Sequence, residues 1–150
     1  MKHSSIISNG LYYLTKISDI DKSDILLFKC RKESGFLEGY LKECALNDEK
    51  TKLMCTYLVR DILTNELVAY FSLKAGFVAT NEERKLFYNS FDSTPAVELA
   101  NFAIIYEYIK AHPVAKGVGK IVFNDFVKYV VKNASNWIGI NIYLYFRLAK

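Results

Sequence analysis

The stretch VAKGVGKIVFNDFV, residues 114–127, has two glycines one residue apart and passes directly into an apolar pattern with helical spacing. Gly117 and Gly119 therefore lie at the N-terminus of a predicted helix. The predicted apolar face of this helix consists of Val118, Ile121, Val122, Phe126, Tyr129 and Val130. A helix N-terminus presents unpaired N–H groups and the positive end of its dipole, and glycine lets a bulky anion approach the backbone. The turn thus predicts a phosphate site.

Two familiar nucleotide-binding motifs do not fit this turn. A Walker A loop needs glycine where Val114 stands and Ser or Thr in place of Ile121, and a dinucleotide fingerprint needs a third glycine at Val122. The turn also has a purely structural explanation, because Gly117 and Gly119 could simply let the chain turn tightly into a helix. The residues alone leave both explanations open.

The rest of the chain predicts an α/β (α+β) fold with a mixed, mostly antiparallel central sheet and helices on both faces. Alternating aromatic and β-branched residues indicate strands, and apolar residues three and four apart indicate helices. The predicted elements are a strand at 11–17, a helix at 33–50, a hairpin of 52–61 and 67–75, a short helix or ordered connection at 81–90, a strand at 94–105, a loop at 106–117, the helix from 118 and a strand at 137–146. The strand at 94–105 is apolar on both faces, which predicts a central position.

Composition limits the class of protein. The 150 residues fit one domain, 1–150, and the net charge of +4 mildly favours anionic ligands without the clustered basic residues of a nucleic-acid binder. Cys30, Cys44 and Cys55 form neither a disulfide framework nor a zinc-binding spacing, so we expect three buried thiols, a cytoplasmic protein and no bound metal. The sequence shows no signal peptide and no apolar run of about 18 residues, so we predict no membrane association.

The order of hairpin, central strand, glycine turn, helix and strand resembles the acetyl-CoA-binding core of the GNAT N-acetyltransferases. The resemblance covers most of residues 11–146 and is closest over 51–146. KLMCTYLVRDILTNELVAYFSL is similar to the family's hairpin, PAVELANFAI to its fourth strand, and VAKGVGKIVFNDFV to its pyrophosphate loop and helix. That loop usually reads Gln or Arg, two residues, Gly, one residue, then Gly or Ala. Gly117 and Gly119 match it, whereas Val114 replaces the Gln or Arg.

The resemblance implies an acetyl-CoA-dependent N-acetyltransferase that passes an acetyl group directly to an amine. The acceptor would be a small molecule, a protein or, as in some toxins of the family, aminoacyl-tRNA; a homodimer also stays open. The residues implied at the cofactor are Ala103, Ile104 and Ile105, through their backbone at the pantetheine arm, and Val114, Ala115, Lys116, Gly117, Val118, Gly119 and Lys120 at the pyrophosphate.

Glu98 is the candidate catalytic base. Only Glu98 and Asn101 are polar in the strand from Pro95, and period-two alternation predicts an apolar environment for Glu98 that destabilises its charged form and makes it a better base. That predicted face also holds Ala96, Ala100, Phe102 and Ile104. In some GNAT members a fourth-strand glutamate accepts the amine's proton, and Glu98 matches its position. The alternative is that Glu98 is solvated or salt-bridged near the start of the strand.

The general acid has no candidate in the sequence. GNAT members usually continue past the fifth strand with a helix that often supplies a tyrosine to protonate the departing thiolate, and this sequence ends at Lys150. The competing hypothesis is a non-catalytic GNAT-like domain that binds the cofactor or another protein. Consumption of acetyl-CoA with an amine would distinguish the two.

Overall fold

The computed structural model describes residues 4–79, 93–138 and 143–145, in which one sheet runs in the order β1-β2-β3-β4-β5-β6. The strands are β1 Ile7–Ser8, β2 Tyr12–Lys16, β3 Cys55–Asp61, β4 Leu67–Ala79, β5 Ser93–Ile104 and β6 Tyr143–Tyr145. Neighbouring strands are antiparallel except for the parallel pair β5–β6. The predicted mixed, mostly antiparallel sheet is therefore confirmed.

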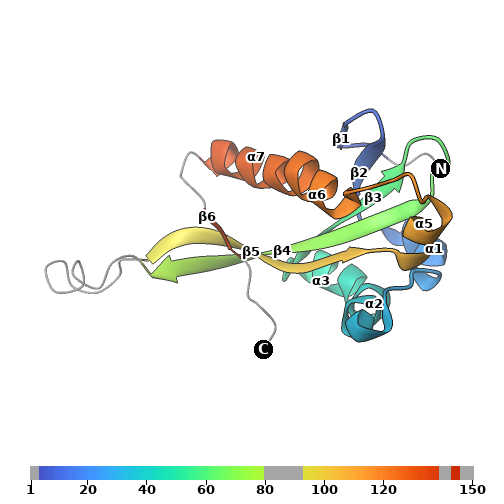
Figure 1. Ribbon diagram of the computed structural model, residues 1–150. Helices are drawn as coiled ribbons and strands as arrows, with labels where there is room; N and C mark the ends of the chain where they lie inside the picture. The colour runs from blue at the N-terminus through green and yellow to red at the C-terminus, as the bar shows by residue number, and fades with distance from the viewer. Residues whose placement is uncertain (1–3, 80–92, 139–142, 146–150) are drawn as a thin grey trace, which may run out of the picture.

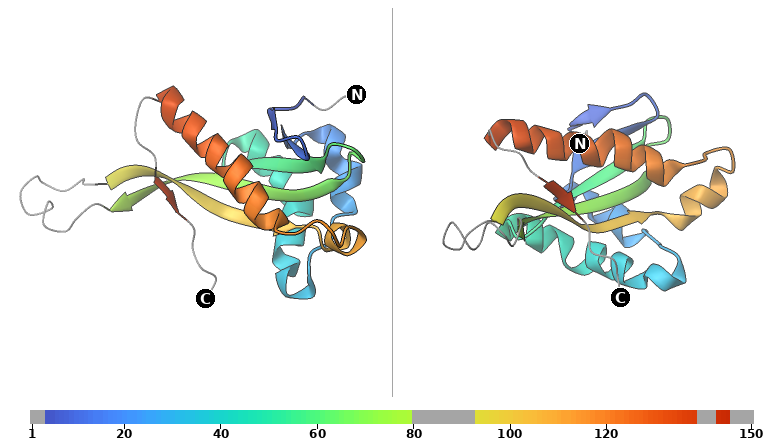
Figure 2. Two further views of the ribbon diagram at one scale, coloured as in Figure 1. Left: turned by 45° about the horizontal axis from the view of Figure 1, so that its top comes forward. Right: turned by 60° about the vertical axis from the view of Figure 1, so that its left-hand side comes forward.

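Helices cover both faces of this sheet (Figure 1). They are η1 Asp19–Asp21, α1 Lys22–Leu26, η2 Lys32–Ser34, α2 Gly35–Glu43, α3 Ala45–Thr51, α5 Tyr106–Ala111, α6 Val118–Val122, the π-helical turn η3 Phe123–Val127 and α7 Lys128–Ile138. Figure 2 shows α6 and α7 crossing one face as a continuous rod, with α1, α2 and α3 on the other. The long hairpin of β4 and β5 extends beyond the helices at one end.

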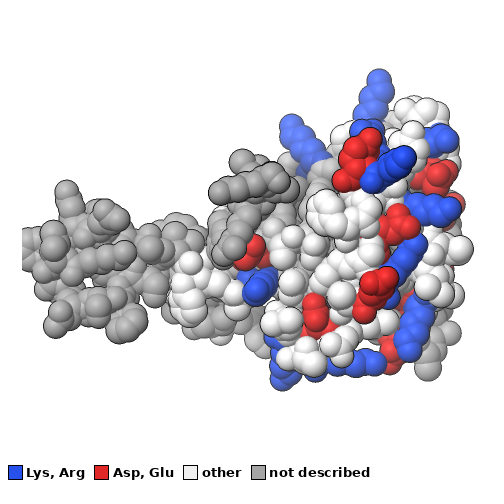
Figure 3. Space-filling model, turned by 90° about the horizontal axis from the view of Figure 1, so that it is seen from below, with Lys and Arg blue, Asp and Glu red and all other residues white. Residues whose placement is uncertain are grey.

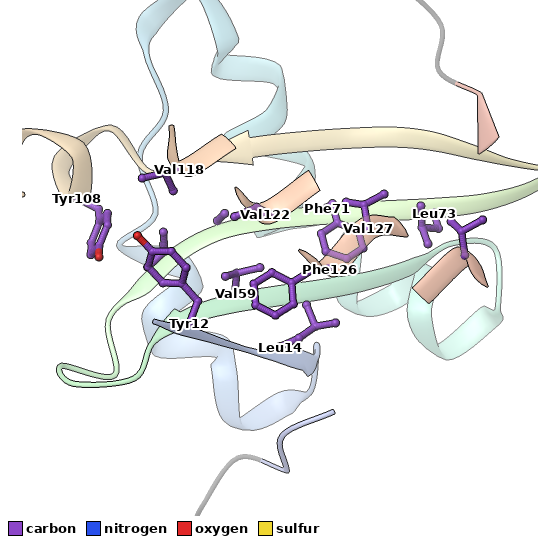
Figure 4. Close-up of a cluster of buried hydrophobic side chains, with 13 residues drawn as sticks. Tyr12, Leu14, Val59, Phe71, Leu73, Tyr108, Val118, Val122, Phe126 and Val127 are labelled. Atoms are coloured by element: carbon purple, nitrogen blue, oxygen red, sulfur yellow. The ribbon is translucent and has the colours of Figure 1, made fainter. Parts of the chain in front are cut away.

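The main core lies between the sheet and the rod of α6 and α7 (Figure 4). Leu14, Val59 and Phe71 contribute from the sheet, and Val122 and Phe126 pack against them from the helix. Each of these five side chains is fully buried. Burying one such side chain stabilises the fold by roughly 1.5–3 kcal/mol, so this interface holds the glycine turn at the start of α6 in place.

The π-helical turn changes which face of the rod is buried. A π turn accommodates one additional residue, which rotates everything after it relative to an α-helix. Val127 and Val131 consequently join the core, whereas Tyr129 is only half-buried and lines a groove with Trp137. The predicted membership of Tyr129 in the core face is therefore wrong.

Other local predictions also differ from the structure. The helix predicted at 33–50 breaks at Cys44, whose backbone separates α2 from α3. The loop predicted at 106–117 contains α5, and the last strand does not start at Trp137 because α7 continues to Ile138. Cys44 is exposed, and Cys30 and Cys55 are half-buried, so the predicted burial of all three thiols is wrong. The helix or connection predicted at 81–90 lies outside the described residues.

Tertiary contacts explain why α5 forms. The side chain of Tyr108 is buried in the core, where its ring meets that of Tyr12 edge-on with centroids 6.3 Å apart. Its hydroxyl donates to Oδ2 of Asp61 at 2.7 Å. Burial alone would raise the pKa of Asp61, but this bond and those from the N–H groups of Thr64 and Leu63 lower it instead. One aromatic side chain thus anchors the segment that leads to the glycine turn.

Candidate active site

A β-bulge in β5 determines where its polar side chains point. Ser72 of β4 pairs with Asn101, but the next residue, Leu73, pairs with Leu99, so Ala100 has no partner on β4. An extra residue of this kind bends a strand and reverses the alternation of its side chains. The alternation of side chains between the two faces of the sheet is therefore reversed on passing Ala100.

The bulge brings Glu98 and Asn101 to the same face of the sheet. Their partners on β4 are Lys74 and Ser72, which share a face with Tyr70 because side chains alternate along a strand. The Tyr70 hydroxyl donates to the backbone carbonyl of Leu37 in α2, so this face is the one that carries α2 and α3.

The predicted surroundings of Glu98 are therefore wrong in part. Phe102 and Ile104 pack on the other face, in the core beneath α6 and α7. Glu98 is half-buried and lies in register between Lys74 of β4 and Tyr145 of β6. Opposite charges across a strand pair attract each other, so the candidate base has a cationic neighbour in place of the apolar contacts expected.

The far edge of β5 is open beside Ile104. The Ile105 N–H donates to the carbonyl of Val68 at 2.8 Å, so the backbone groups of Ile104 point away from β4, as alternation in an antiparallel ladder requires. β6 pairs only with Ala96, Val97 and Glu98 of β5. Within the described residues, no strand pairs with the edge of β5 at Ile104.

The glycine turn presents a row of free donors. Gly117 has a left-handed backbone with φ of 67° and precedes the first residue of α6, and its carbonyl accepts the Ile121 N–H at 3.0 Å. The N–H groups of Val118, Gly119 and Lys120 have no protein acceptor among the described residues. These groups, at the positive end of the helix dipole, suit a phosphate.

The other residues predicted at the pyrophosphate surround the turn. The side chain of Val114 is 91% exposed, and Lys116 and Lys120 are exposed as well. The Ala115 N–H already donates to the carbonyl of His112 at 2.9 Å. The loop therefore offers two lysine charges and the free donors of the helix start.

Gly119 connects the turn to β5. A Cβ atom added at Gly119 would lie 3.8 Å from Cε1 of Phe102, an ordinary van der Waals distance. The turn thus rests on the strand whose edge is open one residue beyond Ala103. The free N–H groups therefore start close to Phe102, two residues before Ile104.

Gly119→Ala should therefore be tolerated. Alanine fits beside Phe102 and suits a helix better than glycine, so we expect the free energy of unfolding to stay the same or rise by up to about 1 kcal/mol. Urea unfolding measures this, with Gly39→Ala in α2 as a matched control because a Cβ there meets no atom within 4 Å. A loss above about 1 kcal/mol would mean that the contact with Phe102 is tighter than the structure indicates.

A cavity of about 240 Å³ lies beside the open edge of β5. It is lined by Cys30, Arg31, Ser34, Leu37, Phe102, Ala103, Ile104, Tyr106 and Ile109. Arg31 and Lys110 each lie 5.6 Å from the centroid of the Tyr106 ring. Burial, with a smaller contribution from Glu38, raises the pKa of the Cys30 thiol to about 11, so this thiol stays protonated at neutral pH.

The positive charges of Arg31 and Lys110 near this cavity are not part of an extended basic surface on the face that carries α2 and α3. Figure 3 shows Lys and Arg side chains interleaved with Asp and Glu across the face that carries α2 and α3. Sequence reasoning did not identify Arg31 or Tyr106, because only the fold brings them to β5. Asn101 carried one signal, that of a polar side chain within an apolar strand.

These features define a fold. The sheet is mostly antiparallel and ends in a parallel strand pair, and a glycine turn starts the helix that connects those two strands. This arrangement is the fold of the GNAT N-acetyltransferases. The resemblance inferred from residues 51–146 is thus confirmed at the level of fold.

Particular GNAT-fold structures match this chain. A Tyr-to-Phe mutant of the toxin KacT superimposes with a TM-score of 0.66 at 21% identity, covering 89% of this chain and 77% of its own. AtaT in complex with acetyl-methionyl-tRNAfMet gives 0.64 at 18% identity, with 89% and 76% covered. AtaTR bound with acetyl-CoA gives 0.66 at 18% identity, with 93% and 76% covered. No family model and no curated relative matches the sequence.

Two further observations concern the described residues alone. No group of three or more His, Cys, Asp or Glu side chains gathers there as a metal site. None of the helices in residues 4–79 and 93–138 is long and apolar enough to cross a membrane.

Proposed function

We propose that this protein is an acetyl-CoA-dependent N-acetyltransferase. Two observations carry the proposal. The N–H groups of Val118, Gly119 and Lys120 have no acceptor among the described residues, and Gly119 lies beside Phe102 of β5, whose edge is open at Ile104. A diphosphate fits the free donors, and an extended amide-containing arm suits an unpaired strand edge. Acetyl-CoA has both parts, and bound there it would supply the acetyl group as a thioester.

Each group of residues has a role in this proposal. Gly117 opens the turn and the three N–H groups hold the pyrophosphate, with Lys116 and Lys120 adding positive charge. The backbone of Ile104 pairs with the pantetheine arm. Glu98 takes the proton of the acceptor amine from the face that carries α2 and α3.

We further propose an aminoacyl-tRNA as the acceptor. AtaT, which has the same fold, is known in complex with acetyl-methionyl-tRNAfMet. In this chain, Arg31 and Lys110 flank the ring of Tyr106 beside the cavity at β5. Cations next to a partly accessible aromatic ring suit a phosphate backbone with an unstacked base.

The direct test uses labelled acetyl-CoA with charged total tRNA in one reaction and a panel of small amines and peptides in another. Acetylated product, detected by mass spectrometry, supports the proposal, and its carrier identifies the acceptor. Acetyl-CoA binding without any acetylated product would instead favour the non-catalytic, cofactor-binding alternative. An absence of binding would contradict the proposed cofactor site.

Glu98→Gln should lower kcat by about 10²–10⁴-fold with little change in the KM for acetyl-CoA, because the carboxylate acts on the amine and does not hold the cofactor. Steady-state rates at saturating acetyl-CoA measure the effect. Glu43→Gln, at an exposed position of α2, is the matched control. A variant with wild-type kcat would exclude Glu98 as the base.

A further inference from the structure

Asn101 retains hydrogen-bonding capacity that the described protein does not use. Its Nδ2 lies 3.9 Å from Sδ of Met54, and a thioether sulfur is a weak acceptor. No residue in the described part of the chain donates to its Oδ1. The NH₂ group carries two N–H donors, and its printed contact within the described residues is the weak one to Met54. Because the side chain is only half-buried, this group stays accessible and can donate to a ligand atom.

The polar groups around Asn101 are already paired. Ser72, opposite Asn101 on β4, shares a hydrogen bond of 2.8 Å with the hydroxyl of Thr56. The Tyr40 hydroxyl donates to Oδ2 of Asp48 at 3.0 Å. Burial foremost, and then this bond, raise the pKa of Tyr40 to about 12, so the phenol stays protonated at neutral pH. Among these groups, Asn101 is the one with hydrogen-bonding capacity left for a ligand.

The spacing between Asn101 and Glu98 suits a particular acceptor. Their partners, Ser72 and Lys74, are two residues apart on β4, so the two side chains leave the sheet about 7 Å apart. An acceptor can bridge this span with two hydrogen bonds of about 2.9 Å, one from its amine to Glu98 and one from Asn101 to an oxygen atom. The fit requires that the oxygen be bonded to the carbon adjacent to the amine-bearing carbon. An aminoacyl group has this arrangement.

We propose that Asn101 determines acceptor specificity by donating its side-chain N–H to the carbonyl oxygen next to the reacting amine. This inference rests on the proposed acetyl transfer and identifies the acceptor as an α-amino acyl compound. Asn101 binds the acceptor, while Glu98 faces the amine. The bulge at Ala100 is what places both side chains on one face.

Two amines test the inference because they differ only in the carbonyl-bearing group. Methioninamide carries a carboxamide next to its amine, and 3-(methylthio)propylamine lacks it. We expect Asn101→Leu to lower kcat/KM for methioninamide about 10-fold and to leave the rate with 3-(methylthio)propylamine unchanged. Asn124→Leu, at an exposed position of η3, is the matched control and should change neither rate.

A binding measurement keeps the test independent of turnover. In NMR spectra of ¹⁵N-labelled protein, the side-chain NH₂ signals of Asn101 are assigned as those that disappear in Asn101→Leu. In the presence of CoA, methioninamide should shift these signals. 3-(Methylthio)propylamine should leave them unchanged. No shift in protein that still binds acetyl-CoA, or a shift caused by CoA alone, would overturn the inference and leave the proposed function standing. A protein that neither binds acetyl-CoA nor acetylates any amine would overturn both.

Discussion

Gly117→Asp is expected to abolish the stabilisation of this protein by acetyl-CoA. A ligand at about 100 times its Kd adds about 2.7 kcal/mol to the free energy of unfolding, which raises Tm by roughly 5–10 °C in a chain of this size. A carboxylate at Gly117 would lie beside the free N–H groups of Val118 and Gly119 and repel the pyrophosphate. Thermal unfolding with and without acetyl-CoA measures the effect.

Gly117→Asn is the matched control. Asparagine has nearly the same size as aspartate and tolerates the left-handed backbone at φ of 67° about as well, so both variants carry the same backbone cost of roughly 1 kcal/mol. Only the aspartate adds negative charge, so the asparagine variant should keep a measurable Tm rise. Full stabilisation of Gly117→Asp by acetyl-CoA would show that the turn is not the phosphate site.

Arg60→Met is expected to cost about 3–5 kcal/mol of the free energy of unfolding, the usual effect of leaving a buried charge without its partner. The side chains of Arg60 and Asp21 are both 0% exposed, with Nη2 and Oδ1 2.8 Å apart. Nη1 lies 2.9 Å from Oδ2 of Asp24 and also donates to the carbonyl of Asn65 at 3.2 Å. The variant would remove the guanidinium from the fully buried Asp21 carboxyl group, which Ser18 also hydrogen-bonds through its N–H and hydroxyl.

Urea unfolding of single and double variants tests this explanation. Arg60→Met/Asp21→Leu removes both buried charges, so it should recover much of the loss, whereas Lys22→Met, which breaks an exposed pair with Asp19, should leave stability unchanged. A loss below about 1 kcal/mol for Arg60→Met would contradict a desolvated ion pair. Through Asp21 and Asp24, Arg60 ties η1 and α1 to the end of β3. The next residue, Asp61, hydrogen-bonds Tyr108 of α5.

Local patterns predicted the elements that carry the site. β-Rich residues predicted β3, period-two alternation predicted β4, and apolar residues on both faces predicted β5. The two glycines predicted the start of α6, where Gly117 does adopt a left-handed backbone. In each case the residue types favour one conformation without help from distant parts of the chain.

The bulge had no such signal. Ala100 is small and apolar and lies in a strand that is apolar on both faces, so a register shift there changes no pattern visible in the sequence. The π turn at Phe123–Val127 is similar, because the residues that it brings into the core are as apolar as those that it moves out. Both features depend on which partner atoms the neighbouring elements offer.

The sequence by itself determined the strands of the central sheet from β2 to β5, the glycine turn at the start of α6 and the resemblance to GNAT enzymes. It could do so because backbone preferences and hydrophobic periodicity act over a few residues. Only the tertiary structure decided that Glu98 and Asn101 share a face, that the edge of β5 is open at Ile104, and that Arg60 is buried. Strand register and burial are set by pairing between residues far apart in the chain, and a local pattern carries no record of that pairing.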